Sequence, residues 1–156
     1  MKIPSRGFID TIVDFRCQIS DWDFGVQMPV NLGAASGSEA GKTYFSTLTI
    51  KRPTDGYTPI FFQYLTRGPS TLSLTLAMTS GTGRGAVQLS ALYKFSSVYI
   101  GNLYQMGATI NSDSPKETLE IFFGQLIMQY GSFEPDGRIS SANKWGWDIK
   151  QNRAVN

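Results

Sequence analysis

The side chains with the clearest chemical potential are two aspartates in the first part of the chain. Asp21 and Asp23 flank Trp22, so both carboxylates lie on one face if this segment is a strand. Two carboxylates on one face can bind a metal ion or act together as acid and base. Both also suit the exposed end of a strand, and we favour this more ordinary interpretation.

The segment Gly81–Gly85 (GTGRG) has the glycine content of a phosphate-binding loop. It lacks the Gly-Lys-Ser/Thr ending of such loops, and no clear helical pattern follows it. We therefore interpret it as a hairpin connection between two strands.

The sequence contains no histidine and a single cysteine, Cys17. Without histidine there is no Ser-His-Asp or Cys-His nucleophile arrangement, no His-Glu-x-x-His zinc site and no imidazole pH switch. One cysteine cannot form an internal disulfide or a cysteine zinc cluster, and Cys17 is most simply a small buried apolar residue. We predict no catalytic residue, no metal site and no cofactor, which favours a binding or structural role.

The chain has the length of one domain and almost no net charge. Its 156 residues include 14 Lys and Arg and 12 Asp and Glu, a net charge of +2. This balance, without a block of like charges, argues against nucleic acid as a partner. No run approaches the roughly 20 apolar residues that span a bilayer, so we expect no membrane insertion. No signal peptide is visible, so we expect synthesis as a soluble cytosolic protein.

Alternating apolar and polar residues indicate a mainly β protein. The clearest run covers residues 72–78, and similar runs occur at 9–19, 44–51, 87–95, 119–123 and 144–150. The apolar phase changes near Ser20, Ser96 and Gly124, which predicts bulges or bends. The pattern predicts about seven or eight strands in a small β-barrel or a sandwich of two sheets.

One short flanking helix is predicted at residues 58–68. Thr58 suits the N-cap, and Pro59 suits the first helical position because its missing N–H costs no hydrogen bond there. The apolar stripe consists of Ile60, Phe61, Tyr64 and Leu65. Gly68 suits a left-handed C-cap. A helix of about ten residues is marginal alone, so it must pack on the outside or the end of a sheet.

Residues 29–42 are expected to form a flexible extended loop. The segment 29–41 (PVNLGAASGSEAG) consists mostly of small and polar residues, which is typical of a loop. Loops of this length in a compact domain are usually functional or disordered.

The C-terminal segment, residues 145–152 (WGWDIKQN), joins a Gly-Trp-Asp sequence to a hydrophobic residue, a lysine and an asparagine, and it resembles the ending of the Hcp family, the inner-tube proteins of bacterial type VI secretion systems. Residues 145–152 (WGWDIKQN) match the family's Gly-Trp-Asp motif and the hydrophobic, basic and Asn positions that follow it. The residues that carry the match are Trp147, Asp148, Lys150 and Asn152. The likeness continues in order upstream to about Phe8, through Cys17–Gly25 and the helix that opens with Thr58 and Pro59.

Two departures mark the chain as a divergent member of that family. The family's Gly-Glu-Ser-x-Asp segment after the first strand is absent, and Asp14, Phe15 and Arg16 stand near its place. The sequence Asp-Phe-Gly at residues 23–25 replaces the family's Ser-Trp-Gly. The C-terminal motif is therefore the specific part of the resemblance.

The resemblance implies one tube domain over residues 1–156, built as a small β-barrel with one helix. It implies hexameric rings that stack into a hollow tube, which a contractile sheath drives from the cell without catalysis. The implied partners are further copies of the chain, the tip spike protein, sheath and baseplate components, and effector proteins. The protein is then expected in the bacterial cytoplasm during assembly, and afterwards outside the cell or in a target cell.

The extended loop is the expected contact to the next ring, as in the family. Its candidate stacking residues are Pro29, Val30, Asn31, Leu32, Gly33, Gly37, Glu39 and Lys42. Ordering a long loop costs entropy, so each contact between rings is expected to be weak. Edge strands rich in Thr and apolar residues also suit pairing between copies.

Three other hypotheses remain open. The first is the tail-tube protein of a related phage-like contractile injection particle. The second is a monomeric β-barrel that binds a small ligand or a carbohydrate on a platform of Tyr99, Tyr104 and Trp145. The third is a carboxylate enzyme that uses Asp21 and Asp23.

Overall fold

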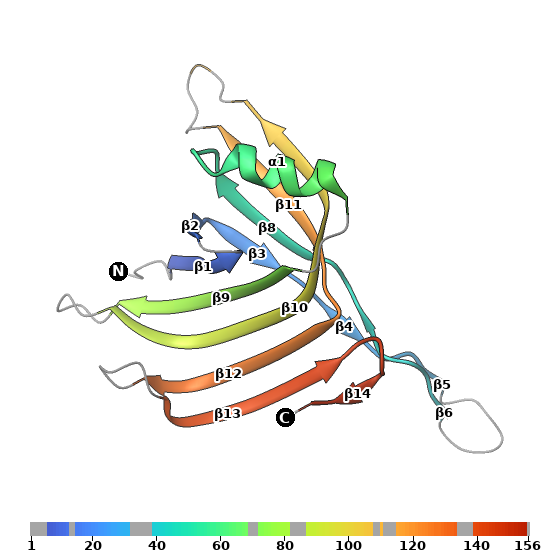
Figure 1. Ribbon diagram of the computed structural model, residues 1–156. Helices are drawn as coiled ribbons and strands as arrows, with labels where there is room; N and C mark the ends of the chain where they lie inside the picture. Colours follow the sequence, from blue (N-terminus) through green and yellow to red (C-terminus); the bar gives the residue numbers. More distant parts are fainter. Residues whose placement is uncertain are drawn as a thin grey trace.

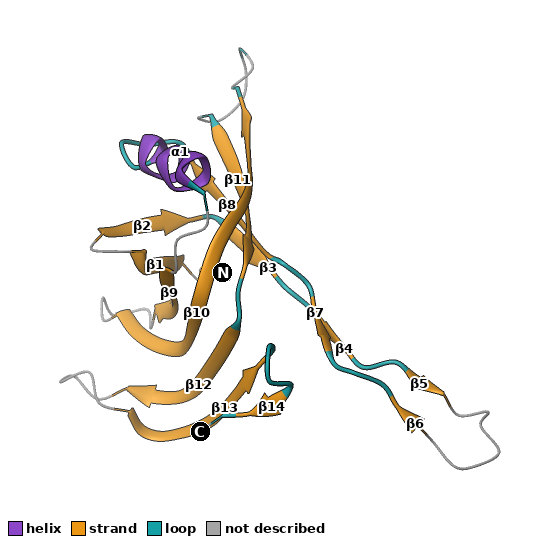
Figure 2. Cartoon of the chain, turned by 45° about the vertical axis from the view of Figure 1, so that its right-hand side comes forward, coloured by secondary structure: helices purple, strands orange, loops and turns teal. Residues whose placement is uncertain are grey.

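The computed structural model shows a curled antiparallel sheet around one core, and a single helix, among the residues that it describes, lies across one end (Figure 1). It describes residues 6–12, 15–31, 39–68, 72–81, 87–107, 110, 115–133 and 139–155. A long ribbon projects away from this body (Figure 2). The predicted mainly β fold with one short helix is confirmed.

Ten strands join one continuous sheet within the described residues. In chain order they are β1 (Arg6–Ile12), β2 (Phe15–Ile19), β3 (Asp21–Asp23), β8 (Leu48–Pro53), β9 (Leu72–Gly81), β10 (Val87–Met106), β11 (Lys116–Phe122), β12 (Gln125–Phe133), β13 (Ile139–Asp148) and β14 (Arg153–Ala154). The main path runs β14-β13-β12-β10-β11-β8-β3, while β9, β1 and β2 extend from β10 as a branch. All these pairings are antiparallel.

The long strand β10 holds the two parts of the sheet together. Its first part pairs with β9 and β12, and residues 99–106 pair with β11. The register shifts before Val98, where Ser97 has a φ of 52°. β11 and β12 follow one another along the same edge of β10, with Gly124 between them. The phase changes predicted near Ser96 and Gly124 therefore correspond to this bend.

The chain changes partner between β2 and β3. β2 pairs with β1, whereas β3 pairs with β8. Ser20, at the junction, donates its backbone N–H to the carbonyl oxygen of Lys51 at 2.8 Å. The phase change predicted at Ser20 thus marks the passage from one part of the sheet to the other, which brings β2 next to β8.

The core lies between the two parts of the curled sheet. Leu72, Leu74 and Leu76 of β9 are buried while Ser73 is exposed, as the alternation predicts. The other buried apolar residues are Cys17, Ile19, Leu48, Ile50, Phe61, Ala91, Tyr93, Phe95, Val98, Leu119, Ile121, Phe123 and Leu126.

Helix α1 spans Thr58–Arg67 and packs against β10. Its bounds agree with the prediction, but its N-cap is Tyr57, which makes no side-chain capping hydrogen bond. The N-cap role predicted for Thr58 is therefore wrong. Thr58 is the first helical residue, and its Oγ1 accepts a hydrogen bond from the backbone N–H of Asp55 at 3.1 Å, which fixes the preceding turn. Gly68 ends the helix with a φ of 84° and a ψ of −173°, a conformation that favours glycine but is not the left-handed C-cap that was predicted.

Candidate functional site

The β-ribbon, residues 26–31 and 39–45, projects away from the body of the molecule (Figures 1 and 2). Its strands are β4 (Val26–Gln27), β5 (Val30–Asn31), β6 (Glu39–Ala40) and β7 (Tyr44–Phe45). β4 pairs with β7 and β5 with β6, both antiparallel. Between the two pairs, Gly41 donates its N–H to the carbonyl oxygen of Pro29 at 2.9 Å. The described part of the predicted extended loop is thus a hydrogen-bonded ribbon.

One arm of the β-ribbon carries an apolar strip, formed by Val26, Met28 and Val30. Val26 lies in β4 and Val30 in β5, and Met28 lies in the short segment between these strands, so the three stand at alternate positions along this arm. Their exposed fractions are 56%, 51% and 49%. A two-stranded ribbon is marginally stable alone in water, and apolar side chains gathered on an exposed projection indicate a contact with another molecule.

Five of the eight predicted stacking residues lie in the described part of this ribbon. Those with exposed side chains are Pro29, Val30 and Lys42. Asn31 stands opposite Glu39 in the pairing of β5 with β6. Those outside the described residues are Leu32, Gly33 and Gly37. Val26 and Met28 are also exposed and lie just before the predicted segment 29–42, and their alternation with Val30 is visible in the sequence.

Aromatic side chains fix the base of the β-ribbon to the core. The ring centroid of Phe24, just before β4, lies 6.3 Å from that of Phe123. The ring centroid of Phe45, in β7, lies 6.2 Å from that of the same phenylalanine. Both pairs meet edge to face, a favourable arrangement for aromatic rings. The β-ribbon therefore extends from a fixed base, which limits the directions in which the apolar strip can point.

The C-terminal motif forms the turn that joins β13 to β14. Asp148, the last residue of β13, accepts at its Oδ1 a hydrogen bond from the N–H of Gln151 at 2.8 Å. Asn152 has a φ of 51°, which Asn tolerates better than most residues. Trp147 pairs with Ala154 of the returning strand, while Lys150 is exposed. The short β14 was not predicted, and β13 begins several residues before the predicted strand at 144–150.

A row of aromatic rings connects this motif with the base of the β-ribbon. The rings of Trp145 and Trp147 stack with centroids 6.2 Å apart and an interplanar angle of 10°. Trp145 also stacks on Phe45, with centroids 6.5 Å apart. The C-terminal motif and the β-ribbon are therefore parts of one structural unit.

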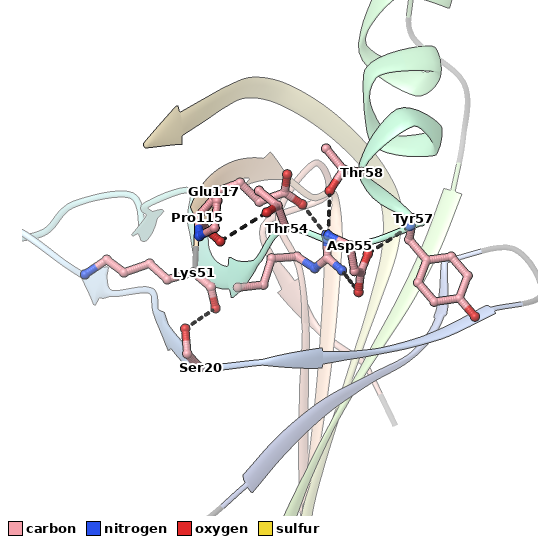
Figure 3. A network of polar contacts seen from close by, with 9 residues as sticks. Ser20, Lys51, Thr54, Asp55, Tyr57, Thr58, Pro115 and Glu117 are labelled. Atoms are coloured by element: carbon pink, nitrogen blue, oxygen red, sulfur yellow. Dashed lines mark hydrogen bonds and ion pairs between the residues drawn. The ribbon is translucent and has the colours of Figure 1, made fainter. Parts of the chain in front are cut away.

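A buried ion pair that was not predicted from the sequence lies against α1. Arg52 on β8 stands opposite Glu117 on β11, and its Nη1 donates a hydrogen bond to Glu117 Oε1. The other terminal nitrogen of Arg52, Nη2, lies 2.5 Å from Asp55 Oδ2. The guanidinium carbon lies 4.9 Å from the ring centroid of Phe61. Figure 3 shows Asp55, Thr58 and Glu117 gathered beside the start of the helix.

The sequence alternation contains the signal for this pair. Arg52 has the same phase in β8 as the buried residues Leu48 and Ile50. Glu117 has the same phase in β11 as the buried Leu119. Opposite charges at inward positions of two strands indicate a buried pair, once those strands are known to be neighbours.

Asp21 and Asp23 lie exposed on β3, as the favoured interpretation predicts. Asp21 Oδ2 lies 3.4 Å from Lys51 Nζ, and both side chains are more than half exposed, at 62% and 52%. Within the part of the chain that the structure describes, no three Cys, Asp or Glu side chains gather as a metal site. The geometry therefore gives no support to a carboxylate enzyme.

The structure does not bring the predicted aromatic platform together. Tyr99 and Tyr104 lie on the part of β10 that pairs with β11, whereas Trp145 lies on β13 and stacks with Trp147. Of the glycine-rich segment, Gly81 is the last residue of β9, and residues 82–85 lie outside the described residues.

Cys17 lies in β2 with 3% of its surface exposed. Burial raises the pKa of its thiol from 9.0 to about 11, although the positive charge of Arg52 opposes the shift. Because the pKa of the thiol is higher in the folded chain, the neutral buried thiol contributes its full stability below the pKa of the unfolded chain. This contribution is lost as the pH rises from about 9 to about 11.

Between about pH 8 and about pH 11, we expect the unfolding free energy of the wild-type chain to fall by about 2 kcal/mol more than that of Cys17→Ala. Urea unfolding of both chains across this interval measures the difference, and the common titration of Lys and Tyr residues cancels in the comparison. Parallel pH profiles of the two chains would contradict the prediction.

Two comparisons with known proteins relate the chain to a family and a fold. The sequence profile of a family described as "Type VI secretion system effector, Hcp" matches residues 14–130. A solved structure described as a type six secretion system protein has a TM-score of 0.81 and 19% identity, covering 97% of this chain and 100% of that one. Hcp1 from Salmonella typhimurium has a TM-score of 0.74 and 17% identity, covering 98% and 100%. Hcp1 from Flavobacterium johnsoniae has a TM-score of 0.65 and 14% identity, covering 83% and 98%.

At these identities the structural likeness shows the fold, while the profile match covers most of the chain. No curated protein matches the sequence significantly. The one helix within the described ranges is too short and too polar to cross a membrane.

Proposed function

Because this chain belongs to the Hcp family of type VI secretion proteins, we propose that it is a structural subunit of the secretion tube. Hexameric rings of the chain stack into a hollow tube, which leaves the cell with its effectors when the sheath contracts. The proposal rests above all on the apolar strip of the β-ribbon, which is half exposed in one chain and requires a partner surface. In the tube, the β-ribbon of each subunit contacts the next ring.

The ordered base of the β-ribbon supports a stacking role. Association costs less entropy when the contacting segment is already held in place. Phe24 and Phe45 fix this base against Phe123, so docking orders fewer residues than it would in a fully flexible loop. Each contact between rings is then stronger than the composition of the segment alone suggests.

The ends of the sheet support the closure of a ring. Within the described residues, β3 pairs only with β8 and β14 only with β13. The outer edges of these two end strands of the main path therefore have no further strand partner in the described part of the chain, which suits pairing with another chain. A contact between two different edges is heterologous, and such contacts close into a ring when the rotation between copies permits it.

Further parts of the proposal come from the family. The tip spike protein, the sheath and the baseplate are the partners of the tube, and effectors travel in its lumen. The protein is in the bacterial cytoplasm during assembly and is then secreted. The alternative, a tail-tube protein of a phage-like contractile particle, would form the same stack of rings. Release of the protein from the cell that depends on the type VI sheath would distinguish the secretion tube from this alternative.

Two hollows on the described surface have volumes at or below the lower end of the usual range for small-ligand sites. One, beside α1, has a volume of about 240 Å³, and another, at the base of the β-ribbon, about 290 Å³. Sites for small ligands usually have volumes of about 300–1,000 Å³.

Met28→Lys is expected to abolish stacked tubes and to leave single rings intact. Burial of one such side chain contributes about 1 kcal/mol or more per subunit. Repeated around a hexameric ring, this is about 6 kcal/mol, so ring-to-ring association weakens by about four orders of magnitude. Negative-stain microscopy measures the tubes, and native mass spectrometry measures the rings.

Gln27→Lys is the matched control, because Gln27 is exposed and lies on the opposite face of the β-ribbon. It should form tubes like the wild type. Tubes of normal length from Met28→Lys would show that the β-ribbon does not contribute to stacking. A wild-type chain that stays monomeric over a wide range of concentrations would contradict the tube function itself.

A further inference from the structure

An apolar groove lies between α1 and β10. α1 lies at the end of the molecule away from the β-ribbon (Figures 1 and 2). The lining of the groove includes Tyr64 and Leu65 of the helix, Leu72 at the start of β9, and Tyr99, Ile100 and Gly101 of β10. None of the described residues in its lining carries a charge. Its volume of about 240 Å³ suits one or two apolar side chains.

Beside this groove, β10 offers an unpaired edge. β11 and β12 occupy one edge of β10 in succession. On the opposite edge, the pairing with β9 ends where Leu72 meets Val98. From residue 99 to residue 106, no strand in the described ranges pairs with this opposite edge. Its backbone N–H and C=O groups are therefore open to an added strand.

We propose that this groove and this edge, together called the receiving surface, hold the β-ribbon of a second copy of the chain. The inference rests on the proposed function, in which rings stack, and it names the surface of the next ring that the β-ribbon contacts. The β-ribbon adds to the free edge of β10 through its backbone. The apolar strip packs against the residues that line the groove.

The two surfaces complement one another in backbone and in side chains. Among the described residues, β4 pairs only with β7 and β5 only with β6, so the outer edges of the β-ribbon are also unpaired. The apolar strip and the lining of the groove are both uncharged. When a strand adds to a sheet, backbone hydrogen bonds supply affinity and pockets for alternate side chains supply specificity. Val26, Met28 and Val30 are alternate residues of this kind.

The positions of the two surfaces make the contact head-to-tail. The β-ribbon and α1 lie at opposite ends of the molecule in both views (Figures 1 and 2). Each copy therefore gives its β-ribbon in one direction and offers its receiving surface in the other. Contacts of this heterologous kind repeat without closing when they translate the molecule along an axis, which is the geometry of a stack of rings.

Leu65→Lys is expected to reduce the number of tubes at least about tenfold while single rings persist, because it places a charge in the apolar groove. Gln63→Lys is the matched control, since it adds the same charge to an exposed position of the same helix. Normal tubes from Leu65→Lys, together with loss of tubes in Met28→Lys, would overturn the receiving surface and leave the tube function standing. Normal stacking combined with loss of tip spike binding in Leu65→Lys would assign the groove to the spike protein instead.

Cross-linking tests the contact without relying on the fold of a charged variant. Met28→Cys/Leu65→Cys should form a ladder of disulfide-linked chains when assembled tubes are oxidised, as seen on a non-reducing gel. Met28→Cys/Gln63→Cys is the control and should give no ladder. A ladder from the control alone, or from neither variant in tubes seen by microscopy, would overturn the proposal.

Discussion

Glu117→Ala should lower the free energy of unfolding by about 3–5 kcal/mol, because it breaks a buried ion pair from one side. The side chains of Arg52 and Glu117 are both fully buried. Without the carboxylate, the guanidinium stays in the core with Asp55 as its remaining ion partner, and that side chain is 38% exposed. The desolvated positive charge is then only partly compensated.

Urea unfolding at neutral pH measures the loss, and an exposed ion pair between β3 and β8 provides a matched control. Asp21→Ala breaks the pair with Lys51, whose side chains are more than half exposed, and should cost no more than about 1 kcal/mol. Arg52→Met/Glu117→Leu should recover most of the loss, since no charge then stays buried. Equal losses from Glu117→Ala and Asp21→Ala would show that the buried pair has no special role in stability.

The buried pair also positions a surface that the proposed stack uses. Arg52 contacts Asp55 just before α1 and Phe61 within it. Nearby, Thr54 donates both its N–H and its Oγ1 hydroxyl to the carbonyl oxygen of Pro115, at 3.0 and 3.1 Å. These contacts hold α1 to the ends of β8 and β11, and α1 forms one wall of the groove. Glu117→Ala should therefore weaken stacking as well as stability.

The predictable parts of the fold are those where the sequence pattern is long. Strand β9 alternates over residues 72–78, and α1 combines an apolar stripe with Pro59 and Gly68, so both follow from the sequence. The phase changes near Ser20, Ser96 and Gly124 also proved to be bends, because a buried face must stay aligned with the core.

The β-ribbon and β14 were not predictable as strands, because each of their segments is only two residues long. Alternation over two residues carries no signal, and these pairings depend on contacts with distant residues such as Phe123. The pairing of Arg52 with Glu117 depends likewise on β8 lying next to β11, which the sequence does not state. Composition located the segment that projects, and the alternation of Val26, Met28 and Val30 is visible in the sequence, but only the structure shows that this stretch extends away from the body (Figure 2).

Gly146→Val is the second substitution for which we expect a large effect, a loss of about 1–3 kcal/mol or more of unfolding free energy. A Cβ atom at Gly146 would lie 2.8 Å from both the carbonyl oxygen and Cγ2 of Val155, and 3.2 Å from Cγ1 of Ile127. Val155 donates its N–H to the carbonyl oxygen of Gly146 at 3.1 Å. A side chain would therefore push the returning end of the chain away from β13 and break this hydrogen bond.

Gly56→Ala is the matched control, because a Cβ at Gly56 would meet no atom within 4 Å. Its stability should stay within about 0.5 kcal/mol of the wild type. Val155→Ala should offset part of the loss in Gly146→Val, since it removes one of the two atoms in conflict, and the coupling of the two substitutions measures that part. If Gly146→Val had the same unfolding free energy as the wild type, the close packing of Val155 on Gly146 would not contribute to stability. Because Trp145 and Trp147 flank Gly146 and stack toward Phe45 at the base of the β-ribbon, a displaced C-terminus should also reduce stacking of rings that still form.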